Sequence, residues 1–125
     1  MGMFIMSIER KGLKRIHPVL NTFIDKIKAI YGDALKSVIL FGSYARGDER
    51  DGSDVDILLL LDMDRKTIDS KDDALCELVF EYEVQEHIEI SPVTMSVLEY
   101  TKWKNVHEFL KNVREDGVNL YGNAA

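Results

Sequence analysis

Apolar residues recur at three- and four-residue intervals in three stretches of the chain, and this spacing predicts three amphipathic helices. The first is expected from about Pro18 to Tyr31, because proline is tolerated at the start of a helix and Gly32 ends it. The second occupies residues 69–82. The third begins at Ser96, whose spacing from Glu99 matches a capping box.

Three other stretches have the pattern of β-strands. Residues 37–42 and 54–62 are continuous apolar runs, which are typical of buried strands. Residues 84–91 alternate between apolar and polar, which predicts a half-buried strand ended by Pro92. Residues 118–121 predict a short edge strand. The order helix, strand, strand, helix, strand, helix indicates a small α/β (α+β) layer with helices packed on a sheet.

Composition is consistent with an ordinary globular protein. The 125 residues match the size of one domain, covering residues 1–125, with 46% apolar and 30% charged positions. No apolar run approaches the roughly 20 residues that span a bilayer, and the opening MGMFIMSIERKG lacks the features of a signal peptide. A cytoplasmic protein is therefore expected, with Cys76 and Trp103 in its core.

The net charge of −6 argues against a nucleic-acid-binding protein, because phosphate backbones are bound by clustered lysine and arginine. It does not exclude a nucleotide, whose phosphates can be neutralised by metal ions. Direct nucleic acid and membrane partners are therefore not expected.

Candidate chemistry is concentrated where the first two predicted strands are joined. Gly42 and Ser43 follow the first strand, where a backbone without Cβ and a hydroxyl can approach phosphate oxygens. Asp54 and Asp56 are two residues apart on the second, so their carboxylates leave one face roughly 6.5 Å apart, at ~3.3 Å per residue. Such a pair can bind Mg²⁺. Alone, Gly42 and Ser43 could form a common turn. Alone, Asp54 could cap a loop while Asp56 faces solvent on an edge strand.

The combination resembles a known signature. Gly42-Ser43, ten residues and then Asp54-Val55-Asp56 resemble the signature of the polymerase-beta-like nucleotidyltransferase superfamily. The longer string FGSYARGDERDGSDVDILLLL resembles its minimal nucleotidyltransferase (MNT) branch, and FLKNVREDGVNLYG is similar to the way such chains end. The resemblance covers most of the chain from Ser37 onward.

The resemblance implies a small mixed sheet flanked by helices, with ATP lying across the strand ends. Gly42 and Ser43 would hold the triphosphate, and Asp54 and Asp56 would bind Mg²⁺, with two ions expected. An acceptor hydroxyl would attack the α-phosphate, and pyrophosphate would leave. Such a reaction needs positioning and charge neutralisation more than covalent catalysis, which suits a small protein.

Relatives usually carry a third carboxylate on a later strand. Glu89 is the candidate here because it lies on the polar side of the predicted strand 84–91, although Glu86 is a near competitor and many relatives have aspartate. Arg46 follows Ser43 closely enough to reach a phosphate. A solvated Arg46 paired with Asp48 or Glu49 is the alternative.

The family points to a function that depends on a second protein. Stand-alone MNT chains resemble antitoxins that inhibit a HEPN ribonuclease toxin by attaching AMP to one of its tyrosines. The resemblance therefore implies a protein adenylyltransferase. With 125 residues, a large acceptor-binding domain is not expected in this chain. The alternative is a non-catalytic, nucleotide-binding antitoxin that neutralises its toxin by forming a complex. Homo-oligomers and hetero-oligomers are both compatible with either function.

Overall fold

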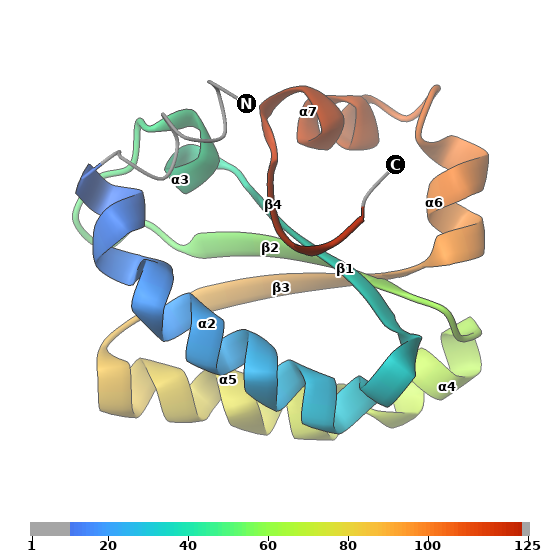
Figure 1. The fold of residues 1–125 in the computed structure, drawn as a ribbon, viewed down its shortest axis with the longest axis horizontal. Coiled ribbons are helices and arrows are strands. Elements are labelled where there is room, and N and C mark those ends of the chain that lie inside the picture. The colour runs from blue at the N-terminus through green and yellow to red at the C-terminus, as the bar shows by residue number, and fades with distance from the viewer. Residues whose placement is uncertain (1–10, 124–125) are drawn as a thin grey trace.

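The computed structural model describes residues 11–123, which fold around a four-stranded sheet with the order β3-β2-β1-β4 (Figure 1). β1 pairs antiparallel with β2 and β4, whereas β2 and β3 are parallel, so the sheet is mixed, as the resemblance implied. The four strands are β1 (Leu35–Phe41), β2 (Val55–Leu61), β3 (Ile90–Ser96) and β4 (Val118–Gly122). The expectation about a signal peptide concerns residues 1–10, which lie outside the described part.

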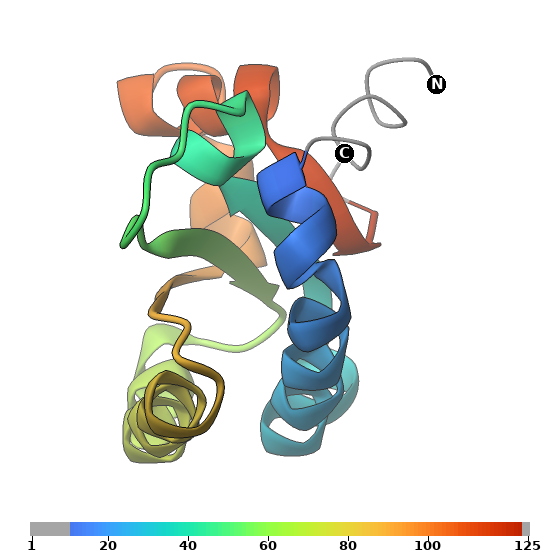
Figure 2. The same cartoon turned by 90° about the vertical axis from the view of Figure 1, so that its left-hand side faces the viewer.

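Helices pack on both faces of the sheet. α2 and α5 cover one face, and α6 and α7 cover part of the other (Figures 1 and 2). None of the helices in residues 11–123 is both long enough and apolar enough to cross a membrane. The helices are α2 (Lys11–Tyr31), the 3₁₀ turn η1 (Gly32–Ala34), α3 (Ser43–Arg46), α4 (Arg65–Ser70), α5 (Asp72–Glu86), α6 (Val97–Trp103) and α7 (Glu108–Asp116).

The central strand β2 is buried on both faces, which explains its continuous apolar sequence. Its odd-numbered positions, including Ile57 and Leu59, belong to the larger core with α2 and α5. Leu58 and Leu60 belong to a smaller core with α6 and α7. β2 is therefore held from both sides, and the residues at its start are fixed in position.

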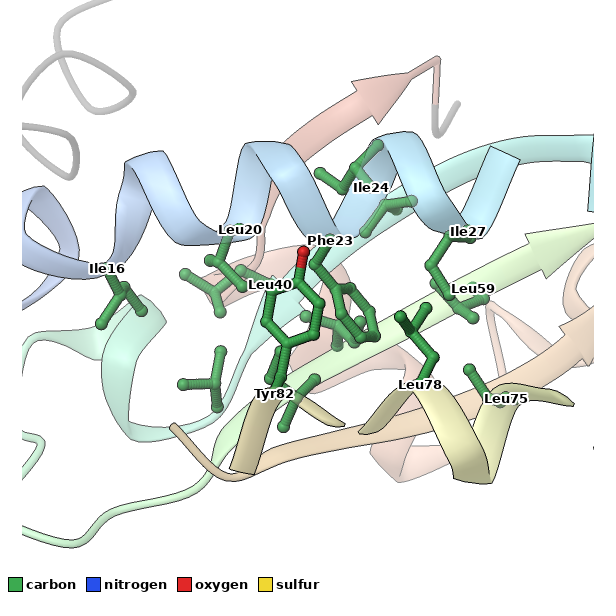
Figure 3. Close-up of a cluster of buried hydrophobic side chains, with 14 of the residues drawn as sticks. Ile16, Leu20, Phe23, Ile24, Ile27, Leu40, Leu59, Leu75, Leu78 and Tyr82 are labelled. Carbon is green, nitrogen blue, oxygen red and sulfur yellow. The ribbon is translucent and has the colours of Figure 1, made fainter. Parts of the chain in front are cut away.

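The packing of α5 against α2 fixes the point at which the chain enters β3. The rings of Phe23 and Tyr82 meet edge to face with centroids 5.1 Å apart (Figure 3). The Tyr82 hydroxyl also lies 2.7 Å from the hydroxyl of Thr22, so it keeps a polar partner at the edge of the core. Only a short turn separates the end of α5 from β3, so this contact positions that turn as well.

The first helix begins earlier than predicted. α2 starts at Lys11, and Pro18 lies inside it rather than at its start. An interior proline removes one backbone hydrogen bond at a cost of about 3 kcal/mol. The helix continues because an apolar stripe is buried on both sides of the proline, from Leu13 to Tyr31. Its end before Gly32 is as predicted, with φ +61° at that glycine.

The predicted strand 84–91 is wrong in position. Residues 84–86 end α5, and the strand begins at Ile90. The alternation was misleading because Val84 is on the exposed side of a helix, 55% accessible, and not in the core. Pro92 does not end the strand but lies inside β3, which is an edge strand and so has one side where a missing N–H costs nothing.

Three further expectations need correction. The second helix, predicted over residues 69–82, is α5 and begins at Asp72, because Asp69 and Ser70 belong to the separate short helix α4. Cys76 is exposed on α5, and Trp103 is 46% accessible, so neither belongs to the core. The predicted third helix is two helices, α6 and α7, separated by residues 104–107. The edge strand at the carboxyl end is confirmed as β4.

We predict that the capping box of α6 contributes measurably to stability. The Ser96 hydroxyl accepts the Glu99 backbone N–H at 3.0 Å, and the Glu99 carboxylate accepts the Ser96 N–H at 3.2 Å. Ser96→Ala should lower the free energy of unfolding by about 1 kcal/mol in urea titrations. Thr101→Ala, at an exposed position in the same helix, is the control and should not lower it. Equal losses would contradict the assignment.

Candidate active site

The three acidic residues of the predicted site lie where β2 and β3 begin, at the end of the sheet that faces the viewer in Figure 2. Val55 is aligned with Ile90, and the Val55 N–H donates to the Glu89 carbonyl at 2.8 Å. The preceding residues, Asp54 and Glu89, therefore stand opposite each other across the parallel pair. Asp56 lies one step further along β2 on the same face as Asp54.

Two of the three carboxylates, Glu89 and Asp56, have a raised pKa. A side-chain contact with Asp54 raises the pKa of Glu89, and the charges of Asp54 and Glu83 add to the effect. Burial raises the pKa of Asp56, the charge of Asp54 raises it further, and Arg46 partly offsets both. The site therefore carries an excess of negative charge, which a bound cation would neutralise.

Gly42 connects β1 to the short helix α3, and two features of its surroundings require glycine. Its φ of +75° is unfavourable for residues with a Cβ. A Cβ at this position would also overlap the carboxylate of Asp56. The structure therefore brings the two halves of the sequence motif together, with Gly42 against Asp56 and Ser43 as the first residue of α3.

Arg46 is the last residue of α3, and it lies near both Asp48 and the acidic site. Its Nε is 3.3 Å from Oδ2 of Asp48, in an exposed ion pair. Its charge also lowers the pKa of Asp56, so the guanidinium is close to the acidic site. Of the two partners considered, Arg46 pairs with Asp48. It also lies beside Gly42 and Asp56.

The sequence left Glu86 and Glu89 as competitors for the third acidic position. Glu86 is the last residue of α5, whereas Glu89 directly precedes β3 and contacts Asp54. The geometry places Glu89 with the pair on β2. Within residues 11–123, however, the side chains form no group of three or more acidic, histidine or cysteine residues already arranged to hold a metal ion.

A pocket of about 440 Å³ has Glu89 in its lining, but neither Asp54 nor Asp56. The other walls come from α2, α3, the loop 51–53 and the turn between α5 and β3. Arg15 donates to the Tyr44 hydroxyl at 3.0 Å in this wall, and His87 lines it from the end of α5. None of Arg15, Tyr44 and His87 belongs to the sequence motif.

Two proteins of Methanocaldococcus jannaschii, each named "Putative protein adenylyltransferase", resemble this chain in sequence. One is 40% identical over 81 residues, or 64% of this chain, and the chain spans only about half of that relative, 54%. The other is 36% identical over 102 residues, covering 82% of this chain and 94% of the relative.

Solved structures agree on the fold. A Sulfolobus solfataricus protein described as "a putative nucleotidyltransferase" superimposes with a TM-score of 0.57 at 18% identity, over 97% of this chain and 88% of that one. A toxin-antitoxin structure with AMP-PNP gives a TM-score of 0.51 at 22% identity, over 82% and 73% of the two chains. At these identities the likeness concerns the fold.

The family model of the nucleotidyltransferase domain matches residues 20–118, which include β1, β2, β3, Asp54, Asp56 and Glu89. The match, the second M. jannaschii relative and the fold agree with one another. This chain therefore belongs to the nucleotidyltransferase domain family.

Proposed function

We propose that the protein is a Mg²⁺-dependent adenylyltransferase that transfers AMP from ATP to a tyrosine of a HEPN ribonuclease toxin, and so acts as an antitoxin. The observation that carries this proposal is the meeting of Gly42 with Asp56, beside Asp54 and Glu89, at one end of the sheet. Relatives named as protein adenylyltransferases support the reaction. Solved toxin-antitoxin structures of the same fold, MntA-HpeT among them, support the kind of partner.

The β1 side of the site is suited to the triphosphate. Gly42 lets the chain turn sharply against Asp56, which leaves room for phosphate oxygens beside the backbone. Ser43 supplies a hydroxyl and an N–H at the start of α3, and Arg46 supplies a permanent positive charge at its end. These residues would orient the phosphates without taking part in bond breaking.

The donor set fits Mg²⁺. Asp54, Asp56 and Glu89 offer carboxylate oxygens, which this ion prefers. The charge of Asp54 contributes to the raised pKa of both Glu89 and Asp56, which is consistent with an excess of negative charge at the site. When bound, Mg²⁺ would neutralise charge on the phosphates during transfer. Asp54 and Asp56 would be its main ligands, with Glu89 as the third.

The reaction requires no covalent intermediate with this chain. The acceptor oxygen forms a bond to the α-phosphorus as the bond from that phosphorus to the bridging oxygen of the β-phosphate breaks. Pyrophosphate leaves with the bonding electrons, and the acceptor proton passes to a carboxylate oxygen of Glu89. The chain's own contribution is to align the two substrates and to hold negative charge where a cation can bridge it.

We predict that the two aspartates are essential for transfer. With α-labelled ATP, Mg²⁺ and a candidate HEPN partner, Asp54→Asn and Asp56→Asn should each reduce labelling of the partner at least about a hundredfold. Asp62→Asn, at the exposed opposite end of β2, is the control and should label normally. Equal labelling by all three variants would contradict the mechanism. Loss of labelling with intact suppression of the nuclease would instead support the non-catalytic antitoxin.

We predict that the same site destabilises the metal-free protein. Because the folded-state pKa of Asp56 is raised above its ordinary 3.8, the fold loses stability as the pH rises through these values. Asp56→Asn should therefore melt at a higher temperature than wild type at pH 7, with the difference vanishing below about pH 3. Mg²⁺ should stabilise the wild type more than the variant in the same assay. A less stable variant at pH 7 would refute the proposed charge repulsion.

We predict that Gly42 is required for chemistry and not only for folding. Gly42→Ala and Gly32→Ala introduce similar strain, since both glycines have positive φ, and each should cost on the order of 1 kcal/mol. Only at Gly42 would the new Cβ meet the Asp56 carboxylate, whereas nothing lies within 4 Å at Gly32. Transfer should fall at least about tenfold for Gly42→Ala alone. Equal activities would show that the contact with Asp56 is not needed.

A further inference from the structure

The outer side of α5 carries an apolar stripe. The inner side of this helix packs toward α2, as Figure 3 shows for Leu75, Leu78 and Tyr82. On the outer side, Cys76, Phe80 and Val84 follow one another at four-residue spacing, and all three are exposed. Phe80 is 65% accessible and Val84 is 55% accessible. The outer side of a surface helix is ordinarily polar, so this stripe is unusual for a face that meets only water.

A groove of about 400 Å³ begins at this stripe and extends to the edge strand β3. Its apolar surface comes from Leu75, Val79 and Phe80 of α5 and from Pro92 of β3. We call this feature the α5 groove. Apolar surface that is open to solvent and bordered by polar residues is typical of a site of protein contact.

The segment that forms this side of the molecule holds the protein's excess of negative charge. Residues 72–89 contain seven acidic residues and no lysine or arginine, so their formal charge is −7, whereas that of the whole chain is −6. The rest of the chain therefore carries a net charge of +1. Asp72 and Glu83 line the α5 groove itself. Lys26 pairs with another of the seven, Glu81, at 3.0 Å.

This charge selects among the classes of partner. Nucleic acid and anionic lipid headgroups would be repelled, whereas a protein surface rich in lysine and arginine would be attracted. A basic surface alone would leave Phe80 and Val84 in water. The complementary surface therefore combines apolar side chains with lysine and arginine beside them.

A helix fits the α5 groove better than an added strand does. β3 is an edge strand, but its outer side is partly closed to pairing. Pro92 has no N–H to donate, and the Thr94 carbonyl accepts a hydrogen bond from Nη2 of Arg65 at 3.2 Å. The stripe from Cys76 to Val84 is about 12 Å long at ~1.5 Å per residue. An amphipathic helix can cover such a stripe with side chains three, four and seven residues apart.

We propose that the α5 groove is a docking site for an amphipathic helix of a second protein, apolar along one face and with lysine and arginine beside that face. The groove is separate from the carboxylates of Asp54, Asp56 and Glu89, none of which lines it. This docking site goes beyond the proposed function and does not depend on it, because binding of a helix requires neither ATP nor transfer.

Binding of a designed helix tests the site on the full 125-residue chain. The probe is the fluorescently labelled peptide KALKRLAKALKRLAK, which has leucines along one helical face and basic residues beside them, and anisotropy gives its Kd. Phe80→Ser should raise this Kd at least about tenfold, because it removes the largest exposed apolar side chain of the groove. Leu98→Ser is the matched control, since Leu98 is 82% accessible on α6. It should change the Kd less than about twofold.

The charge requirement has its own variants. Asp73→Asn combined with Glu77→Gln removes two charges beside the stripe, and it should raise the Kd about fivefold at low salt and less at high salt. Glu115→Gln combined with Asp116→Asn, at exposed positions on α7, is the control and should leave the Kd unchanged. A peptide with serine at every leucine, and one with glutamate at every basic position, should each bind at least about tenfold more weakly.

Cys76 reports on the α5 groove directly, because it is the single cysteine of the chain and is exposed on the stripe. Saturating peptide should slow its alkylation by iodoacetamide at least about tenfold. Unchanged alkylation would overturn the proposal, as would equal Kd values for wild type and Phe80→Ser or equal binding of the serine peptide.

A second copy of this chain is the competing occupant. In that case Cys76 would become protected without peptide as the protein concentration rises. Sedimentation would then show an oligomer that Phe80→Ser dissociates. This result would assign the stripe to self-association and would overturn docking of a basic helix.

Discussion

The parallel register of β2 against β3 is the constraint on which the candidate site depends. Because Val55 is aligned with Ile90, the residues before them, Asp54 and Glu89, stand side by side. A slip of one residue would move Glu89 to the other face of the sheet. Buried residues of both strands oppose such a slip, since Ile57 and Ile90 are almost completely enclosed in the larger core. The chemistry is thus positioned by apolar packing on the opposite face.

Bringing these carboxylates together lowers the stability of the fold, which points to a functional reason for keeping them there. Acidic neighbours raise the pKa of Glu89, and burial together with Asp54 raises that of Asp56. A protein selected for stability alone would separate these groups. Their retention at the start of the best-buried strand is explained if a cation and a triphosphate complete the charge balance. Arg46 offsets only part of it, and its ion pair with Asp48 is exposed and therefore weak.

The sequence predicted much of the fold because the strongest local patterns coincide with the deepest burial. The two apolar runs became β1 and β2, and the Ser96 capping box formed as expected. Glu89 does lie next to Asp54, as expected, but for another reason. Its position comes from the pairing of β3 with β2 and not from the alternation of residues 84–91. Alternation and helical spacing overlap in short stretches, and only tertiary packing decides between them. The pocket could not be predicted, since Arg15, Tyr44 and His87 come from three separate elements.

The division of β2 into two parts explains how so short a strand serves both stability and chemistry. Its later residues, Leu58 and Leu60, are covered by α6 and α7, whereas Asp54 and Asp56 at its start retain access to solvent. One strand thus provides an apolar anchor and an open polar end, with the phosphate side at Gly42 and the β3 side at Glu89. Under the proposed function, a site built in this way would hold the nucleotide on the flank at Gly42 and leave the other flank open. In the proposed reaction, that open flank is where an acceptor carried by a second protein would approach.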